Sequence, residues 1–151
     1  MKYILISVVS IITVFFPMLV WHNYIMETRE VFQEDLALDV TKHINEYRMD
    51  YNLAPVVTNY ITCDLATARA IEISKGFSHE LFLDRFGISP YYTNVLFGEN
   101  LSRNYHTGEE IVNAWINSQR HKEILRAEFE YGCVVCYKFH CAFNTVKLLK
   151  D

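Results

Sequence analysis

The chain lacks an excess of positive charge. Its 151 residues include 14 lysines and arginines against 18 aspartates and glutamates, for a formal net charge of -4, and the basic residues are scattered along the sequence. Nucleic-acid binding needs a basic patch or stripe, so this composition excludes nucleic acid as a partner. Internal repeats and low-complexity tracts are also missing, and the length predicts one domain with one core rather than two.

No charged side chain interrupts the N-terminal stretch from Tyr3 to Trp21. That is about the length that a helix needs to cross a bilayer. Lys2 and the terminal amine precede it, which favours an N-terminus in the cytoplasm and the rest of the chain outside. A small-x-small cleavage site is missing, so residues 1–26 are expected to be an uncleaved membrane anchor, with a cleaved secretory signal as the alternative. In both cases a short connector over residues 27–37 would lead to an exported domain over residues 38–151.

The exported part contains four cysteines: Cys63, Cys133, Cys136 and Cys141. Outside the cytoplasm, disulfides are permitted. The alternation of apolar residues over 131–148 predicts two strands, and a two-residue loop between them would place Cys136 opposite Cys141. Cys63 would then be left to pair with Cys133. Free buried thiols are the alternative.

The spacing of apolar residues predicts two helices before a long aromatic loop. The first ends near Asn52 and carries a stripe that recurs every three or four residues, formed by Leu36, Val40, Ile44 and Tyr47. The second is expected from Asn59 to Lys75, before Gly76. Its expected inner face contains Ile61, Leu65, Ala68 and Ile71 or Glu72. After the loop, a short strand is expected near residues 92–97.

A third helix begins with a motif that has a structural explanation. Thr107 and Glu110 form a capping box, in which each side chain accepts a hydrogen bond from the backbone N–H of the other residue. Glu109 complements the positive end of the helix dipole. The buried face of this helix is expected to contain Ile111, Val112 and Trp115. On the first helix, Asn45 and Arg48 lie three residues apart and could tie the helix to a loop, although a solvated face is the simpler expectation for Arg48.

Three polar side chains have no such explanation. Glu99 lies in "FGEN", between Phe97 and Leu101, where a carboxylate should be partly buried and needs a cation, a metal or several donors. His79 lies in the aromatic stretch "FSHELF", and His121 precedes "KEIL". A lone histidine of this kind is more often a hydrogen-bonded residue than a ligand.

Five stretches in order resemble the CAP superfamily, named from cysteine-rich secretory proteins, antigen 5 and plant pathogenesis-related proteins, and also called the SCP domain. They are "INEYRMDYNLAPVV", "DLATARAIEISKGFSH", "FGENLS", "EEIVNAWINSQRHKEIL" and "FEYGCVVCYKFHCAFNTV". The similarity runs from about Leu38 to Leu149 and is closer to the compact bacterial members than to the animal ones. It implies an α+β fold, a three-layer α-β-α sandwich with a small antiparallel sheet, secreted or displayed outside the cell after the N-terminal transmembrane or signal helix.

The resemblance also implies a cleft that gathers histidines and acidic residues able to hold a divalent metal. His79 matches the first cleft histidine, and Glu99 matches the glutamate of the GEN triplet. His121 comes from a helix end, as in bacterial-type members, and Ser118 occupies the place of the second glutamate of animal members. Two imidazoles and a carboxylate are a legitimate zinc set, so His79, Glu99 and His121 are the expected metal ligands and Zn²⁺ the expected cofactor.

Two functions follow as hypotheses. The first is a non-enzymatic, membrane-anchored binding module for a lipid, a cell-envelope component or a partner protein. The alternative is a metal-dependent hydrolase of peptide or envelope polymer, in which zinc-bound water attacks and His79, Glu99 and His121 form the catalytic site. The H-E-x-x-H spacing of metalloproteases is missing, and a third interpretation makes the His79–Glu99 pair a hydrogen-bonded support for the fold.

Overall fold

The computed structural model describes residues 17–18, 20–21, 31–80 and 95–149. The chain divides into two compact units, Met1–Phe32 and Gln33–Asp151. Most of the predicted membrane anchor lies outside the described residues. The structure therefore does not bear on whether the anchor is cleaved. Within them, no helix is long and apolar enough to cross a bilayer.

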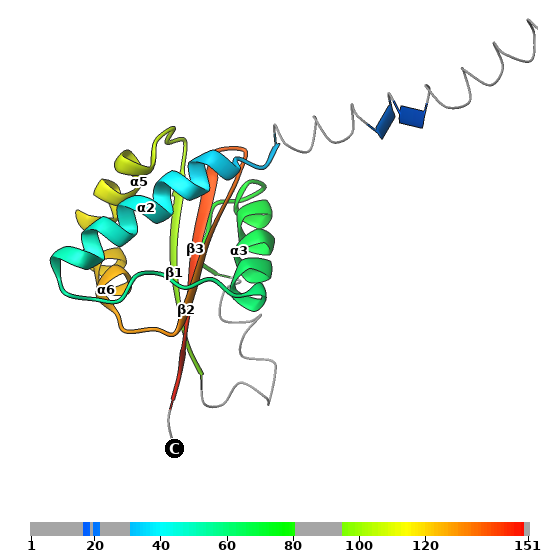
Figure 1. Ribbon diagram of the computed structural model, residues 1–151. Coiled ribbons are helices and arrows are strands. Elements are labelled where there is room, and N and C mark those ends of the chain that lie inside the picture. The colour runs from blue at the N-terminus through cyan, green and yellow to red at the C-terminus, as the bar shows by residue number, and fades with distance from the viewer. Residues whose placement is uncertain (1–16, 19, 22–30, 81–94, 150–151) are drawn as a thin grey trace, which may run out of the picture. The chain divides into compact units, whose positions relative to one another are not determined.

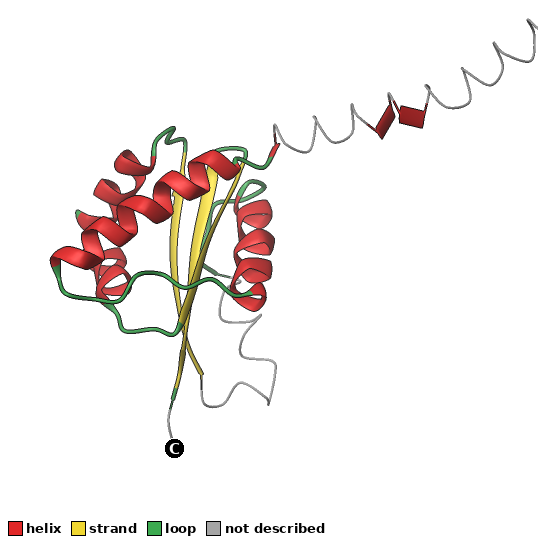
Figure 2. Cartoon of the chain, in the orientation of Figure 1, coloured by secondary structure: helices red, strands yellow, loops and turns green. Residues whose placement is uncertain are grey.

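The second unit combines helices with a small antiparallel sheet (Figure 2). Its elements in chain order are α2 (Glu34–Asp50), α3 (Tyr60–Ile73), β1 (Val95–Arg103), α5 (Gly108–Ile116), α6 (Gln119–Arg126), β2 (Tyr131–Tyr137) and β3 (His140–Leu148). In Figure 1, α2, α5 and α6 cover one face of the sheet and α3 covers the other. The first helix begins at Glu34, inside the stretch 27–37 that the sequence suggested as a connector.

The sheet has the strand order β1-β3-β2, so β1 is an edge strand. Strands β2 and β3 form the predicted hairpin, with Lys138 and Phe139 as its two-residue loop. Both loop residues have positive φ, 47° and 56°, as the favoured two-residue hairpin turn requires. Cys136 therefore lies opposite Cys141. The predicted disulfides Cys136–Cys141 and Cys63–Cys133 are both present.

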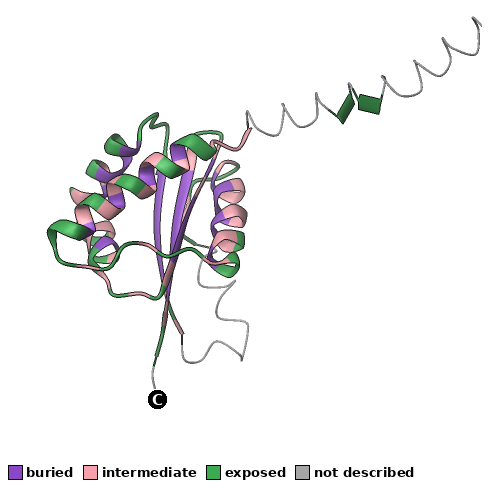
Figure 3. Ribbon diagram, in the orientation of Figure 1, coloured by how far each residue is buried: buried purple, intermediate pink, exposed green. Residues whose placement is uncertain are grey.

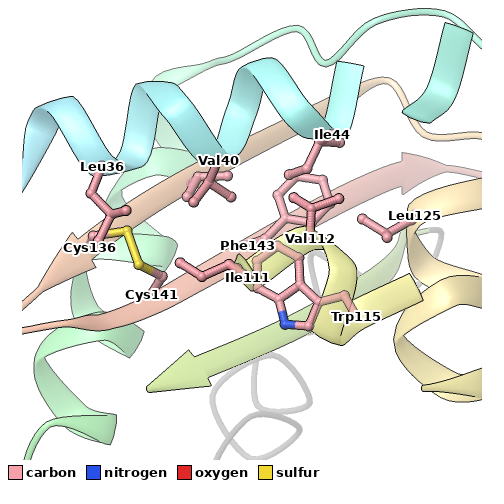
Figure 4. Close-up of a cluster of buried hydrophobic side chains, with 11 residues drawn as sticks. Leu36, Val40, Ile44, Ile111, Val112, Trp115, Leu125, Cys136, Cys141 and Phe143 are labelled. Carbon is pink, nitrogen blue, oxygen red and sulfur yellow. A yellow bond between two sulfur atoms is a disulfide. The ribbon is translucent and has the colours of Figure 1, made fainter. Parts of the chain in front are cut away.

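The largest core cluster lies between the sheet and the layer of α2, α5 and α6 (Figure 4). The buried residues of β3 that join it alternate with those facing α3, because successive strand side chains point to opposite faces. Figure 3 shows this burial concentrated in the sheet and on the inner sides of the helices. The predicted buried positions on the first and third helices are confirmed: Leu36, Val40, Ile44, Ile111, Val112 and Trp115. The Thr107–Glu110 capping box is also confirmed.

The predicted inner face of α3 is wrong by one position. The buried residues of this helix are Thr62, Ala66, Arg69, Ala70 and Ile73. They keep the helical spacing, but the stripe contains a threonine and an arginine whose polar atoms are bonded inside the protein. The prediction took the most apolar face of the helix as the buried one. It therefore selected positions next to the buried residues, and these positions are themselves partly exposed.

Two further boundaries differ from the expectation. Strand β1 runs from Val95 to Arg103 and includes Glu99, whereas the sequence suggested a strand only near residues 92–97. The expected third helix is two helices, and His121 lies in the first turn of the second one, α6. Ser118 separates the two as the residue that precedes α6.

Arg48 is buried, so the expected solvated face is wrong. Its guanidinium donates to the carbonyl oxygens of Ala54, Leu125 and Ala127 at 2.7, 2.8 and 2.9 Å. Asn45 Oδ1 accepts from the backbone N–H of Val56 at 2.8 Å. Both side chains thus tie the first helix to the loop that follows it, and burial lowers the pKa of Arg48.

Candidate functional site

The candidate site is organised around a buried ion pair between α3 and β1. Arg69 is only 2% exposed, and its Nε and Nη2 donate to the two carboxylate oxygens of Glu99 at 2.6 and 3.0 Å. Such a two-point contact is the strongest form of this pair. Burial alone would lower the pKa of Arg69, but hydrogen bonds to Glu99 and Glu72 outweigh it and raise the pKa.

The same guanidinium holds the start of the loop after α3. Arg69 Nη2 donates to the carbonyl oxygen of Ser78 at 2.8 Å, and Nη1 donates to the carboxylate of Glu72. His79, the next residue, brings its Nδ1 to 2.9 Å from Glu99 Oε1. The predicted His79–Glu99 pair is therefore present, although the His79 side chain is 55% exposed instead of buried.

His121 approaches the pair from α6. Its ring centroid lies 6.0 Å from that of His79. Burial lowers the pKa of His121, and the neighbouring His79 lowers it further. The His121 backbone carbonyl accepts a hydrogen bond of 3.0 Å from the side chain of Asn100 on β1. The three residues chosen from the sequence are thus close together, but only His79 and Glu99 are hydrogen-bonded to each other.

The lowered pKa of His121 predicts a pH-dependent stability. Because the folded state favours the neutral imidazole, the unfolded state binds more protons as the pH falls from about 7 through the ordinary histidine pKa of about 6.5. The stability associated with neutral His121 is present above that pKa and is lost as the pH falls through the lowered one. His121→Gln should flatten the loss of stability between about pH 7 and pH 5, as measured by urea denaturation.

The matched control is His106→Gln, since the His106 side chain is exposed and packs on Phe139. This variant should keep the wild-type pH slope. An unchanged slope in His121→Gln would show that the pH dependence comes from other groups.

A groove of about 380 Å³ lies where the end of β1 meets α5 and the start of α6. It is lined by Phe77, Leu101, Ser102, Arg103, Asn104, Tyr105, Ala114, Trp115, Ser118 and His121. Ser102 is buried, and its hydroxyl has no hydrogen-bond partner among the described residues. Asn100 Oδ1 is likewise unpartnered. A buried polar group without a partner is costly, and both oxygens are buried beneath the groove surface.

A protein-family comparison matches residues 41–144 to the CAP model of the cysteine-rich secretory protein family. The chain belongs to the CAP family. No curated protein matches this CAP chain. The family assignment agrees with the resemblance based on the GEN triplet and the two histidine motifs, and these are the residues that the fold brings together.

Solved structures with the same fold come from three bacteria. A Bacillus anthracis extracellular protein with an SCP domain is 22% identical with a TM-score of 0.59 and covers 75% of this chain and 40% of its own. A Staphylococcus aureus cysteine-rich secretory protein is 15% identical with a TM-score of 0.62, and the match covers 75% of this chain and 38% of that protein. An outer surface protein of Borrelia burgdorferi is 23% identical with a TM-score of 0.51, and the match covers 79% of this chain and 95% of that protein. The CAP chain thus spans about two fifths of the first two proteins.

The residue that the sequence analysis missed at this CAP cleft is Arg69. The need of Glu99 for a compensating cation was foreseen, but the cation was not identified. A signal was present, because Arg69 lies three residues after Ala66 and four before Ile73, on the buried stripe of α3. A lone arginine within a helix stripe is usually taken as a sign that the face is solvated, so the signal pointed the wrong way.

The donor set of this CAP cleft does not fit a zinc ion as it is arranged. Both oxygens of Glu99 accept from Arg69, and Oε1 is also within hydrogen-bond distance of His79. A divalent cation would have to approach a carboxylate whose charge a buried guanidinium already balances. Among the described residues, no group of three or more His, Cys, Asp or Glu side chains is placed to hold a metal ion. Zinc binding by His79, Glu99 and His121 stays a prediction for metal analysis to test.

Proposed function

We propose that this CAP domain is a non-enzymatic binding module, held outside the cytoplasm by its N-terminal anchor, for a cell-envelope component, a lipid or a partner protein. The observation that carries the proposal is the buried Arg69–Glu99 pair. Both oxygens of Glu99, the buried carboxylate of the cleft among the described residues, accept hydrogen bonds from Arg69. The cleft therefore presents a fixed hydrogen-bonded wall instead of an activated base.

The groove beside this wall supports binding. Its walls come from opposite sides of the sheet: Phe77 follows α3, and Trp115 belongs to α5. It combines apolar and aromatic surface with a few polar groups, which is the usual composition of a ligand site.

The hydrolase alternative needs zinc-bound water, and it needs Glu99 or His121 to assist proton transfer. When bound, zinc would lower the pKa of its water and supply a nucleophile. In the observed arrangement Glu99 is held by Arg69, and His79 is held against Glu99. The alternative therefore requires the ion pair to open.

Zinc titration distinguishes the two functions. The full-length protein in detergent is expected to contain no stoichiometric zinc by elemental analysis, and its melting temperature should not rise as zinc is added. His79→Ala should behave in the same way, because the structure of the proposed cleft does not depend on a bound metal. Zinc near one ion per chain, with a thermal stabilisation that His79→Ala abolishes, would favour the hydrolase instead.

Ligand binding itself is tested by amide chemical shifts. We expect shifts at Ser102 and Ser118, within the groove, when solubilised envelope fragments or short-chain phospholipid are added to the protein. A matched control is Thr67, whose hydroxyl donates to Cys63 O on α3 away from the groove and whose amide should not move. Shifts spread evenly over both regions would contradict a site at the groove.

A further inference from the structure

The guanidinium of Arg69 is bonded to oxygen atoms from three segments of the chain. Both carboxylate oxygens of Glu99 on β1 accept from Nε and Nη2, at 2.6 and 3.0 Å. The carboxylate of Glu72, three residues along α3, accepts from Nη1. The carbonyl oxygen of Ser78, in the loop after α3, accepts from Nη2 at 2.8 Å. Each guanidinium nitrogen is therefore bonded to at least one of these oxygens.

Carboxylate and backbone carbonyl oxygens are also the ligands that hard divalent cations such as Ca²⁺ take in proteins. A bound metal ion typically joins segments that are distant in sequence, and Arg69 joins α3 to β1 and to the loop after α3 in the same way. An arginine is positively charged at every physiological pH. The cation at this position is thus supplied by the chain itself.

Burial makes a cation necessary at this position. The Glu99 side chain is only 2% exposed and the Glu72 side chain 16%, and a buried carboxylate without a partner is costly. His79 does not replace the guanidinium, because it contacts only one oxygen of Glu99 and its side chain is 55% exposed. The charge balance of the cleft therefore depends on Arg69.

We propose that Arg69 is the built-in cation of this cleft and stands in the place of a divalent metal ion, so that the cleft keeps its structure without metal. A variant without this charge should turn the same oxygens into a site for a hard divalent cation. Oxygen ligands favour Ca²⁺ over Zn²⁺ there. The inference goes beyond the proposed binding function, because it holds whichever ligand the domain binds.

Chelation tests the wild-type cleft. After treatment of the full-length protein in detergent with EDTA, the melting temperature should be unchanged. The backbone amide shifts of Glu72, His79 and Glu99 should also stay as they were. A fall in melting temperature that Ca²⁺ or Zn²⁺ then reverses would overturn the proposal, since a metal ion would be part of the wild-type cleft.

Arg69→Gln tests the loss of the cation. The glutamine amide donates hydrogen bonds but carries no charge. The melting temperature of this variant should rise as Ca²⁺ is added, and isothermal titration calorimetry should give about one bound Ca²⁺ per chain. Arg69→Lys is the matched control, because it keeps the positive charge and should respond no more than the wild type does. Equal responses of the two variants would contradict a charge-dependent site.

Two double variants locate the bound Ca²⁺. Arg69→Gln/Glu72→Gln and Arg69→Gln/Glu99→Gln each remove one carboxylate and should lose most of the response to Ca²⁺. A response that survives in both would place the ion elsewhere and contradict the proposal.

The test also holds if Arg69→Gln is unfolded without metal. Ca²⁺ should then restore its far-ultraviolet circular dichroism, because an ion that binds only the folded state stabilises that state. A variant that stays unfolded with Ca²⁺, or that folds and ignores Ca²⁺, would show that the cleft oxygens do not form a metal site when Arg69 is neutralised.

The outcomes separate this inference from the proposed function. If Arg69→Gln does not respond to Ca²⁺ while phospholipid or envelope fragments still shift Ser102 and Ser118, the binding function stands and the inference is wrong. If the wild type contains zinc that His79→Ala abolishes, both the inference and the non-enzymatic function fail.

Discussion

Arg69→Met is expected to destabilise the domain by about 3–5 kcal/mol, because it leaves the buried carboxylate of Glu99 without its cation. The Arg69 and Glu99 side chains are each only 2% exposed, so water cannot replace the lost partner. Urea denaturation at pH 7 measures the loss.

Two controls make this result specific to the ion pair. Arg69→Met/Glu99→Met removes both charges and should recover much of the stability, because a pair replaced by apolar side chains of similar size is often neutral. Arg120→Met removes an exposed arginine and should change the free energy of unfolding by no more than about 0.5 kcal/mol. A double variant as unstable as Arg69→Met would show that the lost contacts to Ser78 and Glu72, and not the unpaired carboxylate, set the cost.

The disulfide Cys63–Cys133 should contribute more to stability than the second disulfide, Cys136–Cys141. It joins α3 to β2 across a sequence separation of 70, whereas Cys136–Cys141 closes a separation of 5. In the chain-entropy model, loops of these lengths correspond to about 4 and about 2 kcal/mol. Cys63→Ala/Cys133→Ala should therefore lose about 4 kcal/mol in urea denaturation, with α3 the least protected helix.

Cys136→Ala/Cys141→Ala is the matched control for the long bridge. Because Cys136 and Cys141 are buried in the main core, this control also loses packing, and the two variants are best compared by the denaturant slope. The slope follows the surface exposed on unfolding, so opening the long loop should raise it more. Equal slopes would mean that the unfolded chain stays compact around α3 without the bridge.

Much of the fold was predictable because its signals lie close together along the chain. The capping box needs only Thr107 and Glu110, three residues apart, and the hairpin needs only two alternating strands around a two-residue loop. The hairpin then fixes the Cys136–Cys141 pair, and elimination leaves Cys63 with Cys133. The capping box and the hairpin each depend on residues close together in sequence, for which backbone geometry sets the distances.

The candidate site was only partly predictable. Family motifs identified His79, Glu99 and His121, and the fold brings all three together. What holds Glu99 is Arg69, 30 residues earlier, and the inner face that hydropathy predicted for α3 lies one residue away from it. A charged side chain can occupy a buried stripe when its partners lie on another element, and a single-element pattern does not contain those partners.

Sequence alone was enough for the family, the capping box, the hairpin with its two-residue loop, and the pairing of the cysteines. Packing between elements settled the rest: which face of α3 is buried, that Glu99 bonds an arginine, and that Trp115 bonds the backbone of β1 at Leu101. The physical reason is that local propensity and spacing act within one element. Charge compensation and strand exposure depend on which elements become neighbours, and that depends on how the whole chain buries its apolar surface.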